Sequence, residues 1–162
     1  MPRRMRKVLL PLAAALAVAW VVTFAPAAQA DNGCVASIQN PHISSNAGGV
    51  IAKGNWVCAL VPTTIKLNNP YGAGFNLWAC ASNPPQDENY LINNCVWKAA
   101  NFTDFTITVA NSDNIRYTPP LGQPGAHGGG WWIACAQWRA NGPGGLSGLH
   151  TTFSNSAYIV DP

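Results

Sequence analysis

The residues with the clearest catalytic potential lie close together in the C-terminal third of the chain. His127 is followed by three glycines, a pattern in which backbone N–H groups can bind the oxyanion formed during ester hydrolysis. Residues 145–149 differ in one position from the G-x-S-x-G turn that exposes a nucleophilic serine. A triad of Ser147, Asp161 and His150 would have the wrong chain order, and so short a chain without helices cannot build that enzyme fold. We therefore expect no catalytic residue, with a small hydrolase as a minor alternative.

The other ionisable residues form no catalytic or metal-binding pattern. Asp87 and Glu88 are adjacent, so on a strand they would point to opposite faces and could not be the paired carboxylates of a glycosidase. His42, His127 and His150 are far apart in the sequence, and no pair of cysteines has the short spacing of a zinc site. We expect neither a metal nor a cofactor.

Five cysteines indicate disulfides and leave one thiol unpaired: Cys34, Cys58, Cys80, Cys95 and Cys135. Five choices of the free cysteine times three pairings give fifteen schemes. We favour Cys34–Cys58 and Cys80–Cys95, because near neighbours close small loops across adjacent strands. A Cys58–Cys135 bridge between two sheets is the main competitor. In the favoured scheme Cys135 is the free thiol, and its apolar strand predicts a buried, inert side chain.

Aromatic side chains are the better candidates for a binding function. Trp131 and Trp132 are consecutive, so in a strand one faces inward and the other outward, and Trp138 with Arg139 repeats this arrangement. An exposed indole can stack on a sugar or anchor a protein interface, although tryptophan also fills the thin cores of small secreted domains. The predicted partner-binding residues are Trp131, Trp132, Trp138, Arg139, Tyr158 and His127.

The first 30 residues read as a secretory signal peptide. Four basic residues lie within the first seven, an apolar run extends from Val8 to Phe24, and Ala28-Gln29-Ala30 precedes Asp31. An uncleaved membrane anchor is the alternative, because the apolar run approaches the length of a spanning helix. We expect cleavage after Ala30, which leaves residues 31–162 as one secreted domain.

The secreted domain would carry almost no net charge. Without the four N-terminal basic residues, five of the nine Lys and Arg remain against six Asp and Glu, a net charge of −1. The five are scattered, whereas binding to nucleic acid requires a basic cluster. No amphipathic helix with a basic face indicates membrane binding. We expect no nucleic-acid partner and, after cleavage, no membrane contact.

The pattern of short segments predicts an all-β fold. Only 9% of the residues are charged, and 15 glycines and 13 prolines separate stretches rich in β-formers, none with the apolar periodicity of a helix. Predicted strands are Cys34–Gln39, Gly49–Leu60 (one strand, or two broken near Gly54-Asn55), Thr63–Leu67, Phe75–Ala81, Asn94–Lys98, Thr103–Ala110, Trp131–Ala140 and Thr151–Val160. The segments Asn83–Asn89 and Thr118–Gly130 are expected as surface loops. About 7–8 short strands predict a single disulfide-stapled antiparallel β-sandwich, immunoglobulin-like in broad architecture.

Several of these features together resemble a pattern in small secreted actinobacterial proteins. They are Cys34, Asn40-Pro41-His42-Ile43-Ser44, Gly48 to Lys53, Cys58 and Gly129-Gly130-Trp131-Trp132. Such proteins carry signal peptides and disulfides and are predominantly β. The resemblance implies an extracellular location and a β fold, and it carries no catalytic residue across. Small secreted β proteins of such bacteria sometimes serve as adaptors in secreted multi-protein particles, including antibacterial toxins.

The sequence thus predicts a secreted, non-enzymatic module that binds an extracellular protein partner through its loops and an exposed strand edge. The alternative is a module that binds carbohydrate or cell wall through exposed tryptophans. A protease inhibitor, with residues Tyr117–Gly125 as its exposed loop, stays open beside the small hydrolase.

Overall fold

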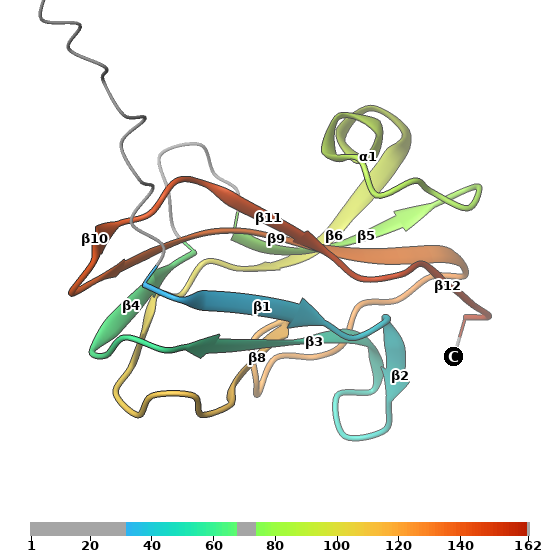
Figure 1. Ribbon diagram of the computed structural model, residues 1–162. Coiled ribbons are helices and arrows are strands. Elements are labelled where there is room, and N and C mark those ends of the chain that lie inside the picture. The colour runs from blue at the N-terminus through green and yellow to red at the C-terminus, as the bar shows by residue number, and fades with distance from the viewer. Residues whose placement is uncertain (1–31, 68–73, 162) are drawn as a thin grey trace, which may run out of the picture.

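A computed structural model describes residues 32–67 and 74–161 (Figure 1), and the predicted signal peptide lies outside the described residues. In this part of the chain, antiparallel strands form two sheets and are accompanied by one short helix. The sheets enclose a common apolar core, so the predicted all-β sandwich is confirmed. Within the same residues, no helix has both the length and the apolar character that crossing a membrane requires.

The smaller sheet is arranged around the long strand β3. Its strands are β1 (Cys34–Ile38), β2 (His42–Ser44), β3 (Gly49–Cys58) and β8 (Asn114–Thr118). β1 and β2 follow one another along one edge of β3, and β8 pairs with the other edge. Val50, Ala52 and Trp56 face the core, whereas the alternate residues Ile51 and Lys53 face outward.

The larger sheet is arranged around β9 (Gly130–Gly142). Along one edge of β9 lie β5 (Gly74–Cys80) and β4 (Thr63–Lys66). β5 pairs on its other side with β6 (Cys95–Asn101), and β4 pairs with β7 (Phe105–Ile107). Along the other edge lie β10 (Gly145–Leu146), β11 (His150–Phe153) and β12 (Ala157–Ile159). Several of the twelve strands in the described chain lie end to end along the same neighbouring strand, like two halves of one interrupted strand. Counted side by side, the smaller sheet is therefore three strands wide and the larger sheet four strands wide.

Three indoles, those of Trp56, Trp132 and Trp138, are buried in the core between the sheets, and the first two are completely buried. Trp56 of β3 meets Phe75 and Phe105 edge to face, with ring centroids 5.6 and 5.5 Å apart. Trp132 of β9 is the second, and the small side chain of Ala134 follows it on the same face of the strand. Alternation of large and small residues on facing strands lets such a thin core close without voids.

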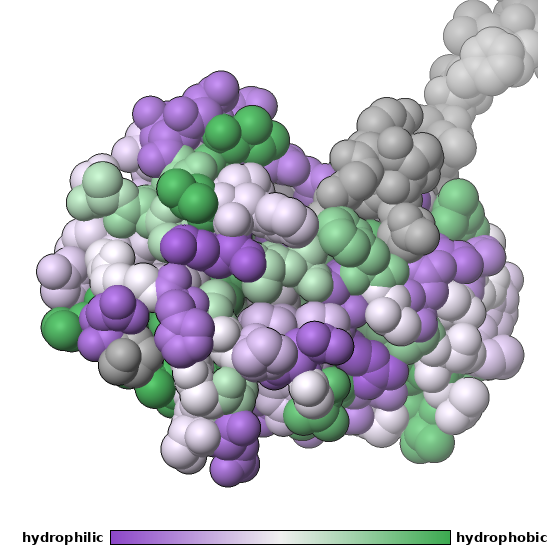
Figure 2. Space-filling view, turned by 180° about the vertical axis from the view of Figure 1, so that it is seen from behind, coloured by the Kyte–Doolittle hydropathy of each residue, from purple (hydrophilic) through white to green (hydrophobic). Residues whose placement is uncertain are grey.

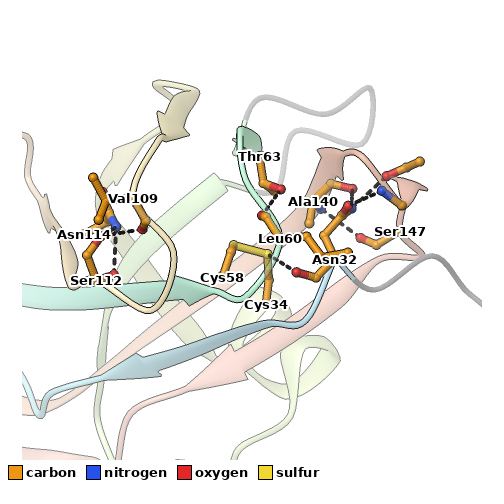
Figure 3. The surroundings of a disulfide bond; sticks show 12 residues. Asn32, Cys34, Cys58, Leu60, Thr63, Val109, Ser112, Asn114, Ala140 and Ser147 are labelled. Carbon is orange, nitrogen blue, oxygen red and sulfur yellow. Dashed lines mark hydrogen bonds between the residues drawn. A yellow bond between two sulfur atoms is a disulfide. The ribbon is translucent and has the colours of Figure 1, made fainter.

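Both disulfides join neighbouring strands within one sheet. Cys34 of β1 is bonded to Cys58, its register partner on β3, with the Cα atoms 4.0 Å apart (Figure 3). Cys80 of β5 is bonded to Cys95 of β6, with a Cα separation of 4.4 Å. The favoured pairing is confirmed, and the competing bridge to Cys135 is not formed, because Cys135 is free and buried.

Asn32 ties the start of the described chain to the turn between β9 and β10 (Figure 3). Its side-chain Nδ2 donates to the carbonyl oxygens of Ala140 (3.4 Å) and Gly145 (2.8 Å), and its Oδ1 accepts from the backbone N–H of Gly144 (2.7 Å). One buried amide thereby satisfies three backbone groups of the larger sheet.

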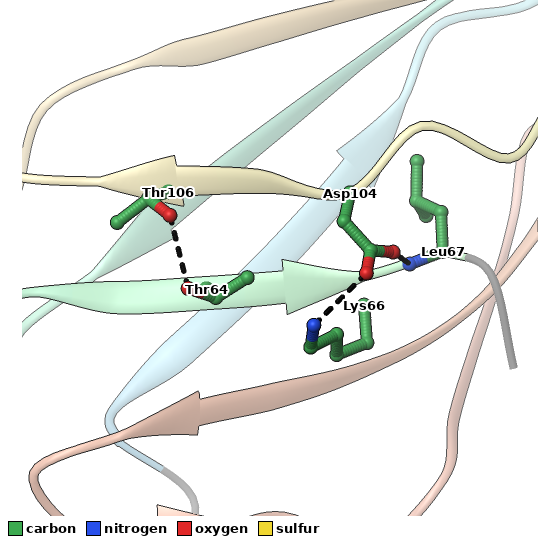
Figure 4. Close-up of polar contacts among 5 residues, drawn as sticks. All are labelled: Thr64, Lys66, Leu67, Asp104 and Thr106. Atoms are coloured by element: carbon green, nitrogen blue, oxygen red, sulfur yellow. Dashed lines mark hydrogen bonds and ion pairs between the residues drawn. The ribbon is translucent and has the colours of Figure 1, made fainter.

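A polar cluster ties β4 to β7 at the opposite edge of the sheet (Figure 4). The Lys66 Nζ lies 3.0 Å from Asp104 Oδ2, and Asp104 Oδ1 accepts from the backbone N–H of Leu67 at 2.9 Å. The hydroxyls of Thr64 and Thr106 are 2.9 Å apart across the same strand pair. These contacts are structural and leave little of the cluster for a ligand.

β3 is one continuous strand, so of the two alternatives for this segment the break near Gly54-Asn55 is not formed. A Cβ built on Gly54 would lie 2.6 Å from Cζ3 of the Trp56 indole. Glycine is required here because the indole of Trp56 packs over the backbone. A glycine can therefore mark a close contact inside a strand and need not mark a turn.

The helix α1 (Glu88–Asn94) begins within the segment predicted as a loop over Asn83–Asn89, and the expectation of an all-strand chain is wrong at this point. Asp87 caps it, since its Oδ1 accepts from the backbone N–H of Tyr90 at 2.7 Å. Leu91 is its buried residue. Seven residues are too few to show a helical period in the sequence, and packing on the sheet stabilises them instead.

Other strand boundaries also differ from the prediction. The segment Thr151–Val160 divides into β11 and β12 because Ser154 bonds Ala134 twice, through its backbone N–H and through its hydroxyl, both at 2.9 Å. The segment Thr103–Ala110 contributes only β7, while β2 and β8 were not predicted. Their three to five residues carry too little alternation to be recognised in the sequence.

Candidate functional site

The residues of the hypothetical serine triad have separate structural roles. The Ser147 hydroxyl is buried, accepts from the Ala140 N–H at 2.8 Å and donates to the Gly148 carbonyl at 2.8 Å. The His150 ring stacks on Trp138 with centroids 4.4 Å apart. Asp161 Oδ1 accepts from the backbone N–H of Gly128 at 3.1 Å. The described residues therefore form no Ser–His–Asp relay, and they bring no three His, Cys, Asp or Glu side chains together as metal ligands.

Two of the predicted anchor residues are in the core rather than on the surface. Trp132 is completely buried and Trp138 is 2% exposed, so the suggestion that they contact a partner is corrected. Both lie on the inward face of β9 because they are separated by an even number of residues. The Trp138 Nε1 donates to the Thr152 hydroxyl at 3.1 Å, which satisfies the indole inside the protein.

The opposite face of β9 carries the predicted residues that do reach the surface. Trp131 is half-buried, and its ring meets Tyr158 of β12 edge to face with centroids 5.5 Å apart. Tyr158 is 64% exposed. The two residues are register partners on neighbouring strands, so the sheet itself places the rings together.

Trp97 of β6 adds a second exposed indole to this outer side of the larger sheet. It is 52% exposed, it lies opposite Trp78 of β5, and its Nε1 donates to Asn76 Oδ1 at 3.0 Å. Sequence reasoning did not select it for binding. The signal was present, however, because Cys95 and Trp97 are two apart on one strand and therefore share a face with the disulfide. We call Trp78, Trp97, Trp131 and Tyr158 the aromatic face.

Helix α1 packs onto the outer side of the larger sheet beside these rings. Its Leu91 contacts a small second core formed with Cys80, Ile133 and Cys135, against which Trp78 and Trp131 also pack. Its position above β5 and β6 is visible in Figure 1. The aromatic face is therefore braced on its own side of the sheet by a disulfide and a capped helix.

Two side chains where α1 meets β9 have altered acidity. Burial, and then the neighbouring Asp87, raise the pKa of the Glu88 carboxyl, to which Gln137 donates a hydrogen bond. Burial, and then the charge of Glu88, raise the pKa of the Cys135 thiol to about 12. A thiol that is buried and protonated is a poor nucleophile, so Cys135 is a packing residue.

The remaining predicted site residues, Arg139 and His127, have other contacts. Arg139 is eight residues from Trp131 along β9, a separation of about 26 Å in a strand, and its guanidinium donates to the Ser147 carbonyl at 3.4 Å. His127 is exposed in the loop before β9, where its carbonyl oxygen accepts from Lys98 at 3.1 Å. The structure thus groups Trp131 and Tyr158 but does not bring Arg139 to them.

A pocket of about 290 Å³ lies on the other outer side of the sandwich, over the smaller sheet. It is formed by the outward-facing residues Ile51 and Tyr117, by the turn between β2 and β3, and by the proline-rich loop that follows β8. Most of this loop was predicted as a surface segment, and residues Tyr117–Gly125 were the candidate loop of a protease inhibitor. The molecule therefore has two candidate sites, one on each outer face.

Comparisons of the chain with protein-family models, with curated proteins and with solved structures found no match.

Proposed function

We propose that the protein acts outside the cell as a non-enzymatic module that binds another protein through its aromatic face. The observation that carries the proposal is the half-exposed Trp97, whose indole is fixed by the side chain of Asn76. Tryptophan and tyrosine dominate the binding energy of protein interfaces. An indole already held in one orientation loses less conformational entropy when a partner covers it.

The spacing of the rings supports a protein partner. Trp97 and Tyr158 lie on β6 and β12, which are separated by β5 and β9. At the usual spacing of strands, the two positions are about 15 Å apart across the sheet. That distance fits within a standard protein interface, which covers ~800 Å² on each partner.

The face of the molecule that Figure 2 shows also favours a specific contact. Seen from behind, apolar patches are separated by polar residues and do not merge into one hydrophobic surface (Figure 2). A few aromatic anchors within a mixed surface are typical of partners that meet after folding, whereas obligate interfaces are more continuously apolar.

An extracellular role is supported by the two disulfides, which indicate an oxidising compartment. The basic and apolar pattern of residues 1–30 supports export by a signal peptide. The resemblance to small secreted actinobacterial proteins favours a partner that is itself secreted, as in an adaptor of a multi-protein assembly.

The test is affinity capture from the extracellular fraction of the source organism, with wild-type and variant proteins compared side by side. We expect a stoichiometric protein partner on wild type, and a loss of at least tenfold in its recovery with Trp97→Ala or Tyr158→Ala. Leu121→Ala is the matched control, because Leu121 is 84% exposed but lies at the pocket on the other outer face. It should retain the partner.

Two results would contradict the proposal. One is a partner retained equally by all three variants. The other is that the wild-type protein elutes without a partner, and that oligosaccharides or peptidoglycan change its tryptophan fluorescence only when Trp97 is present. The ligand of the aromatic face would then be a glycan.

A further inference from the structure

We infer that the pocket over the smaller sheet is a binding site for one ring of a neutral sugar. This inference is independent of the proposed protein partner, because the pocket and the aromatic face lie on opposite outer sides of the sandwich. At about 290 Å³ the pocket is at the lower end of the size range of ligand sites, which suits one ring-sized unit.

The walls of the pocket are apolar and rigid. Tyr117 supplies an aromatic ring next to Ile51, and Pro119, Pro120 and Pro124 form the opposing loop. The C–H groups of a pyranose pack favourably on an aromatic ring. Proline side chains have no rotamer freedom to lose. A ligand that packs against them therefore costs the protein little conformational entropy.

The rim of the pocket carries uncharged hydrogen-bonding groups. Ser44, Asn46 and Gln123 line it, and neither the Asn46 nor the Gln123 amide bonds to another group of the described chain. A side-chain amide has hydrogen-bond donors and an acceptor. It therefore suits the hydroxyl groups of a sugar, each of which can donate and accept a hydrogen bond. None of the described lining residues is charged at neutral pH, so an ionic ligand would lose its hydration without gaining a counter-charge.

The proline loop is held in place before any ligand binds. Val50 and Ala126 exchange two backbone hydrogen bonds of 2.7 and 2.9 Å, and the Gly125 N–H donates to the Ala47 carbonyl at 2.7 Å. Gly49 and Gly125 touch so closely that a Cβ on Gly125 would lie 2.5 Å from the Gly49 carbonyl carbon. Two facing glycines thus allow the loop to join the sheet and preform the pocket.

The experiment is a titration followed by two-dimensional amide NMR of the ¹⁵N-labelled protein. The probes are neutral sugars, namely glucose, cellobiose, maltose and N-acetylglucosamine with its dimer and trimer. Glucuronic acid and a proline-rich peptide are the competing probes. We expect saturable shifts with at least one neutral sugar, including the side-chain amides of Asn46 and Gln123.

Variants keep the result interpretable. Tyr117→Ala and Gln123→Ala should each weaken sugar binding by at least tenfold, and Gln123 is exposed, so its variant should fold normally. Phe102→Ala is the matched aromatic control, because Phe102 is 39% exposed and belongs neither to the pocket nor to the aromatic face, and it should bind as wild type. Saturation by none of the neutral sugars, tighter binding of glucuronic acid, shifts produced by the peptide alone, or equal weakening by Phe102→Ala would each overturn the inference.

Discussion

The free thiol of Cys135 lies beneath Leu91 of α1, in the small core on the outer side of the larger sheet. Its pKa of about 12 follows chiefly from burial and secondarily from the charge of Glu88. We expect iodoacetamide at pH 8 to leave the folded protein unmodified and to add one label per chain after unfolding in guanidinium, as read by intact mass. Full labelling of the folded protein would contradict this assignment.

The same thiol predicts how stability depends on pH. In the unfolded chain the group titrates near its ordinary value of 9.0, while in the fold it keeps its proton to about 12. The free energy of unfolding should therefore fall as pH rises from about 9 towards 12, because the unfolded state releases the proton first. Comparison with Cys135→Ala isolates this effect, since the variant should show a shallower fall over the same range.

Asn32 is the second residue whose position makes a specific prediction. Its buried amide bonds three backbone groups at the turn between β9 and β10, and Asn32→Ala removes these three bonds, while the Ala140 carbonyl keeps its bond from the Ser147 N–H. We expect a loss of ~1–3 kcal/mol in the free energy of unfolding, measured by urea denaturation. Asn155→Ala, at an exposed position, is the control and should change stability little. Equal stabilities would show that the amide does not hold the two segments together.

At the scale of elements, the Cys80–Cys95 disulfide closes the segment that contains α1. Replacing both cysteines by alanine should cost about 2–4 kcal/mol and loosen the helix above the second core. Cys135 should then become reactive to iodoacetamide in the folded protein. Replacing Cys34 and Cys58 should cost a similar amount and leave Cys135 protected, because that disulfide lies in the other sheet. Protection of Cys135 in both double variants would show that α1 stays in place without its disulfide.

The elements also show what the sequence could predict. Residues Trp131–Ala140 were recognised as a strand, and near-neighbour pairing of the cysteines was correct, because both depend on local composition and spacing. Which of Trp131 and Trp132 faces outward depends on the partner sheet, so the sequence left both as candidates. α1 was missed because a seven-residue helix stabilised by one buried leucine has no period of its own.

The pocket could not be predicted from the sequence for a different reason. It depends on the contact of Gly49 with Gly125, which lie in segments far apart along the chain, and on the outward direction of Tyr117 on β8. Glycine-rich turns at both positions were visible, but their contact is a property of the assembled sheet.

At the scale of the whole molecule, the sandwich presents a different chemistry on each outer side. The larger sheet carries aromatic rings braced by α1 and a disulfide, and the smaller sheet carries an uncharged pocket closed by a proline loop. The shared core of Trp56 and Trp132 holds these sides in a fixed relation. A module of this form can hold a partner on one side while the other side stays accessible.

The most direct test of the central proposal is site-specific photo-cross-linking to the captured partner. A photoreactive amino acid is placed at position 158 or 97 on the aromatic face, or at position 121, the highly exposed site on the other side. We predict cross-links to the partner from positions 158 and 97 and none from position 121. A partner that cross-links from position 121 and from neither of the other two would show that the aromatic face is not the binding surface.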